Sequence, residues 1–345
     1  MINYRHATAW GGAYKRVVGR VFDIHFEDVA SIENLLEAWR EFLSGKRAKR
    51  DVQEFQLQLM DNILALHVDL MNGNYRHGGY QAFNISDPKQ RNIHKAAIRD
   101  RLLHHAIYRQ LYPLFERTFI ADSFSCRNNK GTHAAMDRFR TFHRRVSRNN
   151  KRTCWVLKCD IKKFFANIDH AVLTEILRSY ISDEKIIKLL ENIIESFSSG
   201  TAGKGLPLGN LTSQLFVNIY MNEFDQSMKH RLRAKYYIRY ADDFVILSTN
   251  RQWLEIILPE IKFFLSTRLK LQLHPDKLFI KTLASGIDFL GWIHCPDHRV
   301  LRTATKRRML KRLAENPNNE TVASYRGLLQ HGNARKISRM ALDAL

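Results

Sequence analysis

The sequence contains little cysteine and no long apolar run. Its four cysteines, Cys126, Cys154, Cys159 and Cys295, lack paired Cys-x-x-Cys spacing, which argues against a zinc site or a disulfide framework and predicts reduced, buried thiols. No run of about 18 apolar residues is present to span a bilayer, and Met1-Ile2-Asn3-Tyr4-Arg5 opens no signal peptide. We therefore expect a cytoplasmic protein with no membrane partner.

Acidic residues are also few beside basic ones. Lys and Arg number 55 against 34 Asp and Glu, so the formal net charge is +21 and the sequence pI is near 10.0. This excess predicts a polyanionic partner, although a ribosome-binding or other nucleic-acid-binding module would show it too. With 345 residues and 45% hydrophobic content, the chain can bury a sizeable core and is expected to form two or three subdomains.

Three acidic residues stand beside short apolar runs. Tyr240-Ala241-Asp242-Asp243 lies between two such runs, which predicts a tight hairpin with two carboxylates at its tip. Upstream, a buried-strand pattern over residues 154–159 ends at Asp160. Hard cations such as Mg²⁺ take oxygen ligands, and two ions about 3.5–4 Å apart can clamp the attacking and leaving oxygens of a phosphoryl transfer. An isolated Asp-Asp pair is common in turns, so the surrounding residues decide its meaning.

Those surroundings resemble the palm of a reverse transcriptase. Four motifs occur in the family's order: Asp160-x-x-x-Phe164-Phe165, Gly205-Leu206-Pro207-Leu208-Gly209-Asn210-Leu211-Thr212-Ser213-Gln214, Tyr240-Ala241-Asp242-Asp243 and Phe289-Leu290-Gly291. The segments 123–133 and 100–103 are similar to motifs of the family's fingers. The resemblance covers residues 45 to 335, nearly the whole chain.

The resemblance implies an α+β right-hand polymerase with fingers, a palm of antiparallel sheet plus helices, and a helical thumb. We expect an N-terminal extension of unknown role at 1–30, fingers with N-terminal helices at 31–150, a palm with interleaved fingers elements at 151–295, and a thumb at 296–345. Apolar periodicity predicts helices over 35–43, 52–71, 96–114, 170–180, 183–196 and 212–232, fingers strands within 80–93, and a basic helical segment from Arg299.

The family's chemistry can be carried onto matching residues. Asp160 and Asp242 would bridge two Mg²⁺ ions, or Mn²⁺ as a substitute, with Asp243 more peripheral and the backbone carbonyl of Ile161 as a further ligand. Lys277 resembles the lysine that protonates the leaving pyrophosphate, although a lone loop lysine is often merely solvated.

The residues expected at the incoming dNTP form a second group. Phe165, next to Phe164, would lie against the sugar and exclude a 2′-hydroxyl; the alternative is an ordinary core ring. Arg127 and Lys130 fall where the family binds the triphosphate, or they are plain solvated charges. Gly209 would allow close approach of the nascent base pair, flanked by Leu208 and Gln214. The residues expected to contact the nucleic acid are Arg99, Arg101, Phe289, Leu290, Gly291, Lys306, Arg307 and Lys311.

Leu208 before Gly209, with Ser213-Gln214 at the motif's end, resembles the diversity-generating retroelement branch. That branch implies error-prone copying of a structured template RNA from a cDNA or DNA primer with dNTPs, a bacterial or phage origin, and a small basic accessory protein; an aliphatic residue at Leu208 could also be a neutral packing change. The nearest alternative is an anti-phage defence reverse transcriptase that uses a non-coding RNA and a second defence-system protein. A catalytically silent RNA-binding scaffold is the alternative of a different class.

Overall fold

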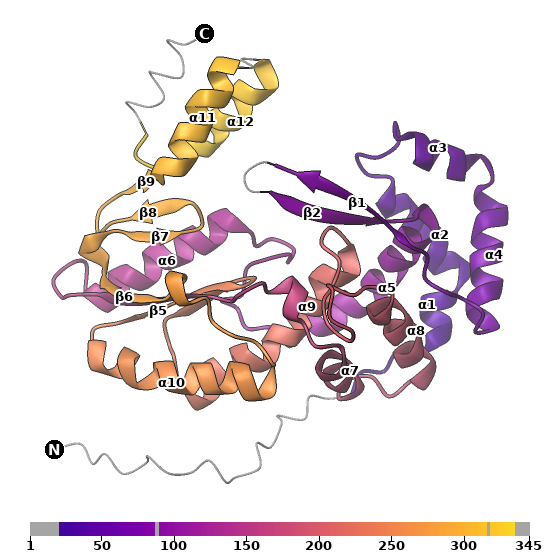
Figure 1. The fold of residues 1–345 in the computed structure, drawn as a ribbon, viewed down its shortest axis with the longest axis horizontal. Helices are drawn as coiled ribbons and strands as arrows, with labels where there is room; N and C mark the ends of the chain where they lie inside the picture. The colour runs from indigo at the N-terminus through magenta and orange to yellow at the C-terminus, as the bar shows by residue number, and fades with distance from the viewer. Residues whose placement is uncertain (1–20, 87–89, 316–317, 335–345) are drawn as a thin grey trace.

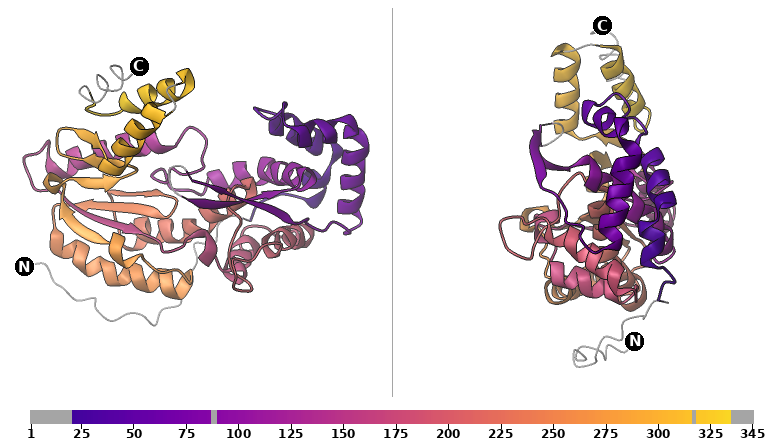
Figure 2. Two further views of the ribbon diagram at one scale, coloured as in Figure 1. Left: turned by 45° about the horizontal axis from the view of Figure 1, so that its top comes forward. Right: turned by 90° about the vertical axis from the view of Figure 1, so that its right-hand side faces the viewer.

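The computed structural model describes residues 21–86, 90–315 and 318–334, and Figure 1 shows their arrangement. Seven elements form the N-terminal third of the chain: α1 (Phe26–Ala30), α2 (Ile32–Phe42), α3 (Arg50–Leu57), α4 (Leu59–Met71), β1 (Tyr80–Ile85), β2 (Arg91–Ala96) and α5 (Ile98–Glu116). Strands β1 and β2 pair as an antiparallel hairpin. Figure 2 shows this hairpin reaching from the helices of the fingers towards the centre of the molecule.

The helices of the fingers agree with the sequence periodicity except at one place. Leu35, Trp39 and Phe42 of α2 are buried as predicted. The single helix expected over 52–71 is wrong, because α3 and α4 meet at Gln58, whose φ of −120° and ψ of 39° interrupt the helix. The side-chain amide of Asn62 donates a hydrogen bond to the backbone carbonyl of Phe55 at 3.0 Å, which satisfies one carbonyl acceptor freed by the break.

The palm surrounds a four-stranded antiparallel sheet in the order β4-β5-β3-β6. The elements between residues 132 and 282 are α6 (Thr132–Ser147), β3 (Trp155–Asp160), α7 (His170–Arg178), α8 (Glu184–Glu195), α9 (Leu211–Gln226), β4 (Tyr237–Tyr240), β5 (Asp243–Ser248), α10 (Arg251–Arg268) and β6 (Phe279–Thr282); α6 lies within the span expected for the fingers but packs on this sheet. Side chains that alternate along β3 and β5 enter two different cores: Leu157 and Phe244 pack in the large core with α9 and α10, whereas Val156 and Val245 pack in the core with α6. Figure 1 shows α6 and α10 on opposite faces of the sheet.

The C-terminal part combines a small sheet with two helices: β7 (Ile287–Phe289), β8 (Trp292–His294), β9 (Arg299–Leu301), α11 (Thr303–Glu315) and α12 (Asn319–Leu329). The prediction of helix from Arg299 is wrong for its first residues, because Arg299–Leu301 pairs with β8 before α11 begins. Trp292, Leu301 and Met309 share one apolar cluster, so the helices are packed on the sheet.

Three remaining sequence predictions concern the termini and the thiols. The extension expected at 1–30 lies outside the described residues up to residue 20, but α1 buries Phe26 and Val29 in the large core. Cys154 and Cys159 are buried as expected, whereas Cys126 is exposed. No helix among the described residues has both the length and the apolar character needed to cross a bilayer.

Candidate active site

The three expected acids meet at one end of the two central strands. Asp160 is the last residue of β3 and lies in register with Asp243, the first residue of β5. Asp242 occupies the turn between β4 and β5 beside Ala241, whose φ of 54° gives the tight reversal. The amide of Ile161 donates to the Asp242 carbonyl at 3.1 Å, which fixes the turn against the end of β3.

Burial and mutual repulsion make this end of the sheet electrostatically costly. Burial raises the pKa of Asp242, and the charge of Asp160 raises it further. Burial also raises the pKa of Asp243, to about 7, against the opposing effect of Lys158. A cation placed among these carboxylates would relieve the repulsion.

Two lysines supply part of that positive charge. Lys277 Nζ lies 2.9 Å from Asp160 Oδ1, and Lys158 Nζ lies 3.0 Å from Asp243 Oδ1. Lys158 stands two residues before Asp160 on the same face of β3. Asp243 Oδ1 is buried and has no hydrogen bond of acceptable geometry among the described residues, so Lys158 neutralises it without fully satisfying it.

The chemistry of the acids suits a hard divalent cation, although their arrangement is not yet that of a metal site. Within residues 21–86, 90–315 and 318–334, no three acidic, histidine or cysteine side chains converge as ligands on one point. The lysine contacts of Asp160 and Asp243 give the physical reason, because each holds a carboxylate oxygen that a metal ion would use.

The aromatic pair after β3 differs in burial. Phe164 is 3% exposed, whereas Phe165 is only partly buried and begins the 3₁₀ turn Phe165–Asn167. The two rings meet edge to face with centroids 5.6 Å apart. The backbone carbonyl of Phe165 accepts a hydrogen bond from the Leu206 amide at 2.9 Å, so the backbone at this residue is tied to the motif Gly205–Gln214, called the glycine-rich motif below.

The glycine-rich motif is fixed to the fingers hairpin. The His94 amide donates to the Leu208 carbonyl at 3.0 Å, and the Asn210 amide group donates to the His94 carbonyl at 2.9 Å. Gly209 has a φ of 104°, and a Cβ there would stand 2.7 Å from Ile93 Cγ2, so the position requires glycine. Gln214, in the first turn of α9, is partly exposed.

The two cations expected at the triphosphate are held elsewhere. Arg127 forms a bidentate ion pair with Glu116 and donates to the carbonyls of Ile120 and Ser123. Lys130 Nζ donates to the Ala121 carbonyl at 2.8 Å. These contacts stabilise the turn before α6, and Arg127 would have to give them up to reach a ligand.

The expected nucleic-acid contacts fall into two groups. Arg99 is paired with Asp69, and Arg101 with Asp51, so both contribute to the packing of the fingers. Phe289 is fully buried, and Leu290 and Gly291 form the β7–β8 turn, both with positive φ. Lys306, Arg307 and Lys311 lie on α11.

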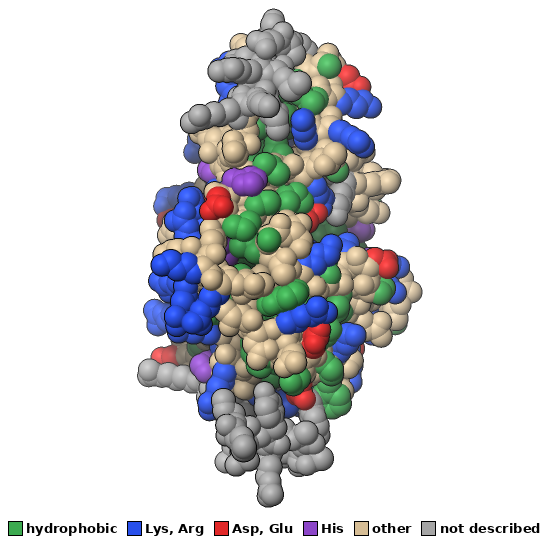
Figure 3. Space-filling view, turned by 90° about the vertical axis from the view of Figure 1, so that its left-hand side faces the viewer, with side chains coloured by type: hydrophobic (Ala, Val, Ile, Leu, Met, Phe, Trp, Pro, Cys, Tyr) green, Lys and Arg blue, Asp and Glu red, His purple; other side chains and the backbone are tan. Residues whose placement is uncertain are grey.

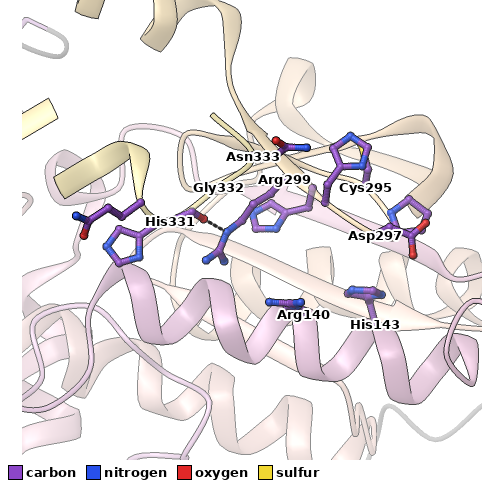
Figure 4. Close-up of a pocket in the computed structure, with 12 residues that line it drawn as sticks. Arg140, His143, Cys295, Asp297, Arg299, His331, Gly332 and Asn333 are labelled. Atoms are coloured by element: carbon purple, nitrogen blue, oxygen red, sulfur yellow. Dashed lines mark hydrogen bonds between the residues drawn. The ribbon is translucent and has the colours of Figure 1, made fainter. Parts of the chain in front are cut away.

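A polar cavity of about 380 Å³ lies between α6, the β8–β9 turn and the residues after α12 (Figure 4). Burial lowers the pKa of His143 and His294 to about 4, so both imidazoles are neutral near pH 7. Figure 4 shows the Arg299 guanidinium turned to the His331 carbonyl, to which its Nε donates. This hydrogen bond joins the start of β9 to the segment after α12.

Sequence reasoning missed several residues around the acids. Lys158 lies within an apolar strand pattern and was not singled out. Its position two residues before Asp160 places both side chains on one face of β3, and this spacing could have identified it. The fully buried pair of Arg239 and Asp225 lies beneath the turn between β4 and β5 that carries Asp242, called the acid turn below. There, Arg239 Nη1 donates to the Ala241 carbonyl at 3.1 Å. Arg91 of β2 is exposed and near enough for its charge to favour ionised Asp242.

The fold and the acid cluster together define a right-hand polymerase. The family described as reverse transcriptase (RNA-dependent DNA polymerase) matches residues 86–294, more than half of the chain. The chain therefore belongs to the reverse transcriptase family, whose members are RNA-directed DNA polymerases and generally use divalent metal ions such as Mg²⁺.

Individual relatives agree with this assignment. Protein YkfC of Escherichia coli is 28% identical over 79% of this chain and 82% of its own length. The group II intron-encoded protein LtrA of Lactococcus lactis is 23% identical over 64% of this chain and 46% of its own length, so the chain spans about half of that relative. In fold, the chain is similar to a Candida albicans telomerase solved with a telomeric RNA fragment, with a TM-score of 0.51 and 11% identity over 74% of this chain and 53% of that one.

Proposed function

We propose that the protein extends a cDNA or DNA primer on an RNA template, with Asp160 and Asp242 as the ligands of two Mg²⁺ ions. The observation that carries this proposal is the meeting of Asp160, Asp242 and Asp243 at one end of β3 and β5. Bound metal would lower the pKa of the primer 3′-hydroxyl and hold the triphosphate. The Ile161 carbonyl remains a candidate further ligand.

The lysines have distinct proposed roles. Lys277 would leave Asp160 if metal were bound there and would then serve as the proton donor to pyrophosphate; the supporting observation is its 2.9 Å contact with that acid. Lys158 stays with Asp243 and keeps that carboxylate peripheral, because its side chain is only 10% exposed.

We assign the contacts to the incoming nucleotide by the exposure of each side chain and by its position relative to the three acids. Phe165 presents a partly exposed ring for the deoxyribose, and Gly209 leaves room for the nascent base pair. For the triphosphate we place Arg91 ahead of Arg127 and Lys130, because Arg91 is exposed and near Asp242 whereas Arg127 is occupied by Glu116. The hairpin turn 289–291 and α11 would hold the primer–template duplex.

For the branch, we propose an error-prone enzyme of a diversity-generating retroelement, acting in the cytoplasm of a bacterium on a dedicated structured RNA with a small basic accessory protein. The supporting feature is Leu208 at the motif anchored to β2, where an aliphatic side chain offers no polar contact to the pairing bases. Accurate copying, or repetitive products from a non-coding RNA, would favour the anti-phage alternative instead.

The test is primer extension by the purified protein on an RNA template with Mg²⁺ and dNTPs, followed by sequencing of the products. Asp160→Asn and Asp242→Ala should each abolish extension and leave RNA binding within about twofold, because only the metal ligands are lost. Asp61→Ala, an exposed acid of α4, is the matched control and should extend as wild type does. Extension that persists in Asp242→Ala, or its absence from the wild type, would overturn the proposed activity and favour the scaffold.

A further inference from the structure

A strongly basic surface lies at the end of the palm that is remote from the acid turn. We define the palm-end patch as Arg145, Arg148, Lys151, Arg152, Arg233 and Lys235. All six are exposed, and they come from the end of α6, the turn that follows it and the segment before β4. Figure 3 views the molecule from the end where α6 finishes and α10 begins, and shows Lys and Arg side chains gathered along one side of it.

Within the part of the chain that the structure describes, the charge of the patch is not neutralised by carboxylates. None of its six side chains forms an ion pair with a carboxylate of the described residues, whereas Arg138 and Lys229 nearby both pair with Asp122. Uncompensated like charges on one surface repel each other and favour the binding of a polyanion.

The patch also surrounds a hollow with aromatic walls. The hollow measures about 370 Å³, and Arg145, Arg152, Arg233 and Lys235 line it together with Tyr236 and Trp253, while no acidic residue lines it. Tyr236 and Trp253 are each partly exposed. Tyr236 is braced edge to face by Phe142, with ring centroids 5.2 Å apart, which gives it a fixed orientation.

We infer that the palm-end patch is a second RNA-binding surface, which holds a part of the structured template RNA lying outside the catalytic cleft. Arginine forks suit phosphate oxygens, and partly exposed aromatic rings offer stacking faces for an unpaired base. An acidic protein would use the charge but not both rings within a concave basic hollow. This inference rests on the proposed function, because it names where a folded template RNA is held.

The experiment compares two variants that lose the same charge. Arg145→Gln/Arg152→Gln/Arg233→Gln removes three cations from the patch, and Arg117→Gln/Lys188→Gln/Lys262→Gln removes three exposed cations elsewhere. Binding of a long labelled stem–loop RNA is measured by fluorescence anisotropy across a salt series, with polyglutamate as a second probe. Extension of a short primer–template that fills only the cleft is measured in parallel.

We expect the patch variant to bind the stem–loop about tenfold more weakly than the control variant, with a salt slope smaller by about 2, because about three phosphate contacts are lost. Extension of the short primer–template should be equal in both variants. Equal stem–loop binding by the two variants would overturn the inference, as would patch-dependent binding of polyglutamate with unchanged RNA binding. Failure of the proposed function would instead appear as a wild-type protein that does not extend the short primer–template, whatever the variants bind.

Discussion

The buried ion pair beneath the acid turn offers the most quantitative test of this structure. Arg239 and Asp225 are both fully buried, and Asp225 accepts hydrogen bonds from Arg239 Nη2 at 2.6 Å and from Tyr237 Oη at 2.6 Å. The Asp225→Asn change keeps the shape of the side chain but removes its charge. The Arg239 guanidinium is then left buried without a counterion.

The expected cost follows from that burial. Removing one partner of a buried ion pair costs about 3–5 kcal/mol, whereas breaking an exposed pair costs about 0–1 kcal/mol. Asp225→Asn should therefore lower the free energy of unfolding by about 3–5 kcal/mol. The matched control is Glu255→Gln, which breaks the exposed pair with Arg251 and should cost less than about 1 kcal/mol. Urea unfolding followed by far-ultraviolet circular dichroism measures both.

A double replacement separates charge from shape. Asp225→Leu combined with Arg239→Met removes both buried charges and should recover more than half of the stability lost in Asp225→Asn. If Asp225→Asn is no less stable than Glu255→Gln, the reasoning about this pair is refuted. Because Arg239 also holds the Ala241 carbonyl, folded Asp225→Asn should extend primers more slowly than wild type.

Three further predictions concern the site itself. Because the pKa of Asp243 is raised, the folded protein binds the proton of this carboxyl more tightly than the unfolded protein does. With metal removed by EDTA, the protonated Asp243 therefore stabilises the fold at low pH, and this contribution to the free energy of unfolding is lost as pH rises from about 4 to about 7. Asp243→Asn should abolish that loss, and urea titrations at several pH values would show about 4 kcal/mol of difference in pH dependence, because raising the pKa from 3.8 to about 7 corresponds to that free energy; parallel pH curves would contradict it. Lys277→Ala should lower kcat by about 10²-fold because the proton donor is lost, and it should lower the Mg²⁺ concentration for half-maximal extension because Asp160 is freed from its ion pair. Steady-state kinetics with a Mg²⁺ titration measures both effects. An unchanged kcat would show that Lys277 takes no part in the chemistry. Gly209→Ala should reduce extension more than tenfold at about unchanged RNA affinity, because the new Cβ meets Ile93; full activity in the same primer-extension assay would refute the need for glycine.

Local sequence patterns predicted much of the fold. Short continuous apolar runs located β3 and β5, which are buried on both faces of the sheet, and helical periodicity located α2 and α5, which each bury one stripe in the core. The break at Gln58 was not predictable because no Gly or Pro marks it in residues 50–71, and the strand at Arg299–Leu301 was not predictable because it depends on pairing with β8.

The sequence by itself determined the order of the motifs, the presence of three acids beside apolar strands, and the basic charge. Only the tertiary structure decided how those charges are used. It pairs Asp160 with Lys277, Asp243 with Lys158 and Arg127 with Glu116, and among the described residues it leaves the palm-end patch without a carboxylate partner. Electrostatic energy depends on distance and burial, and neither can be read from the order of residues along the chain.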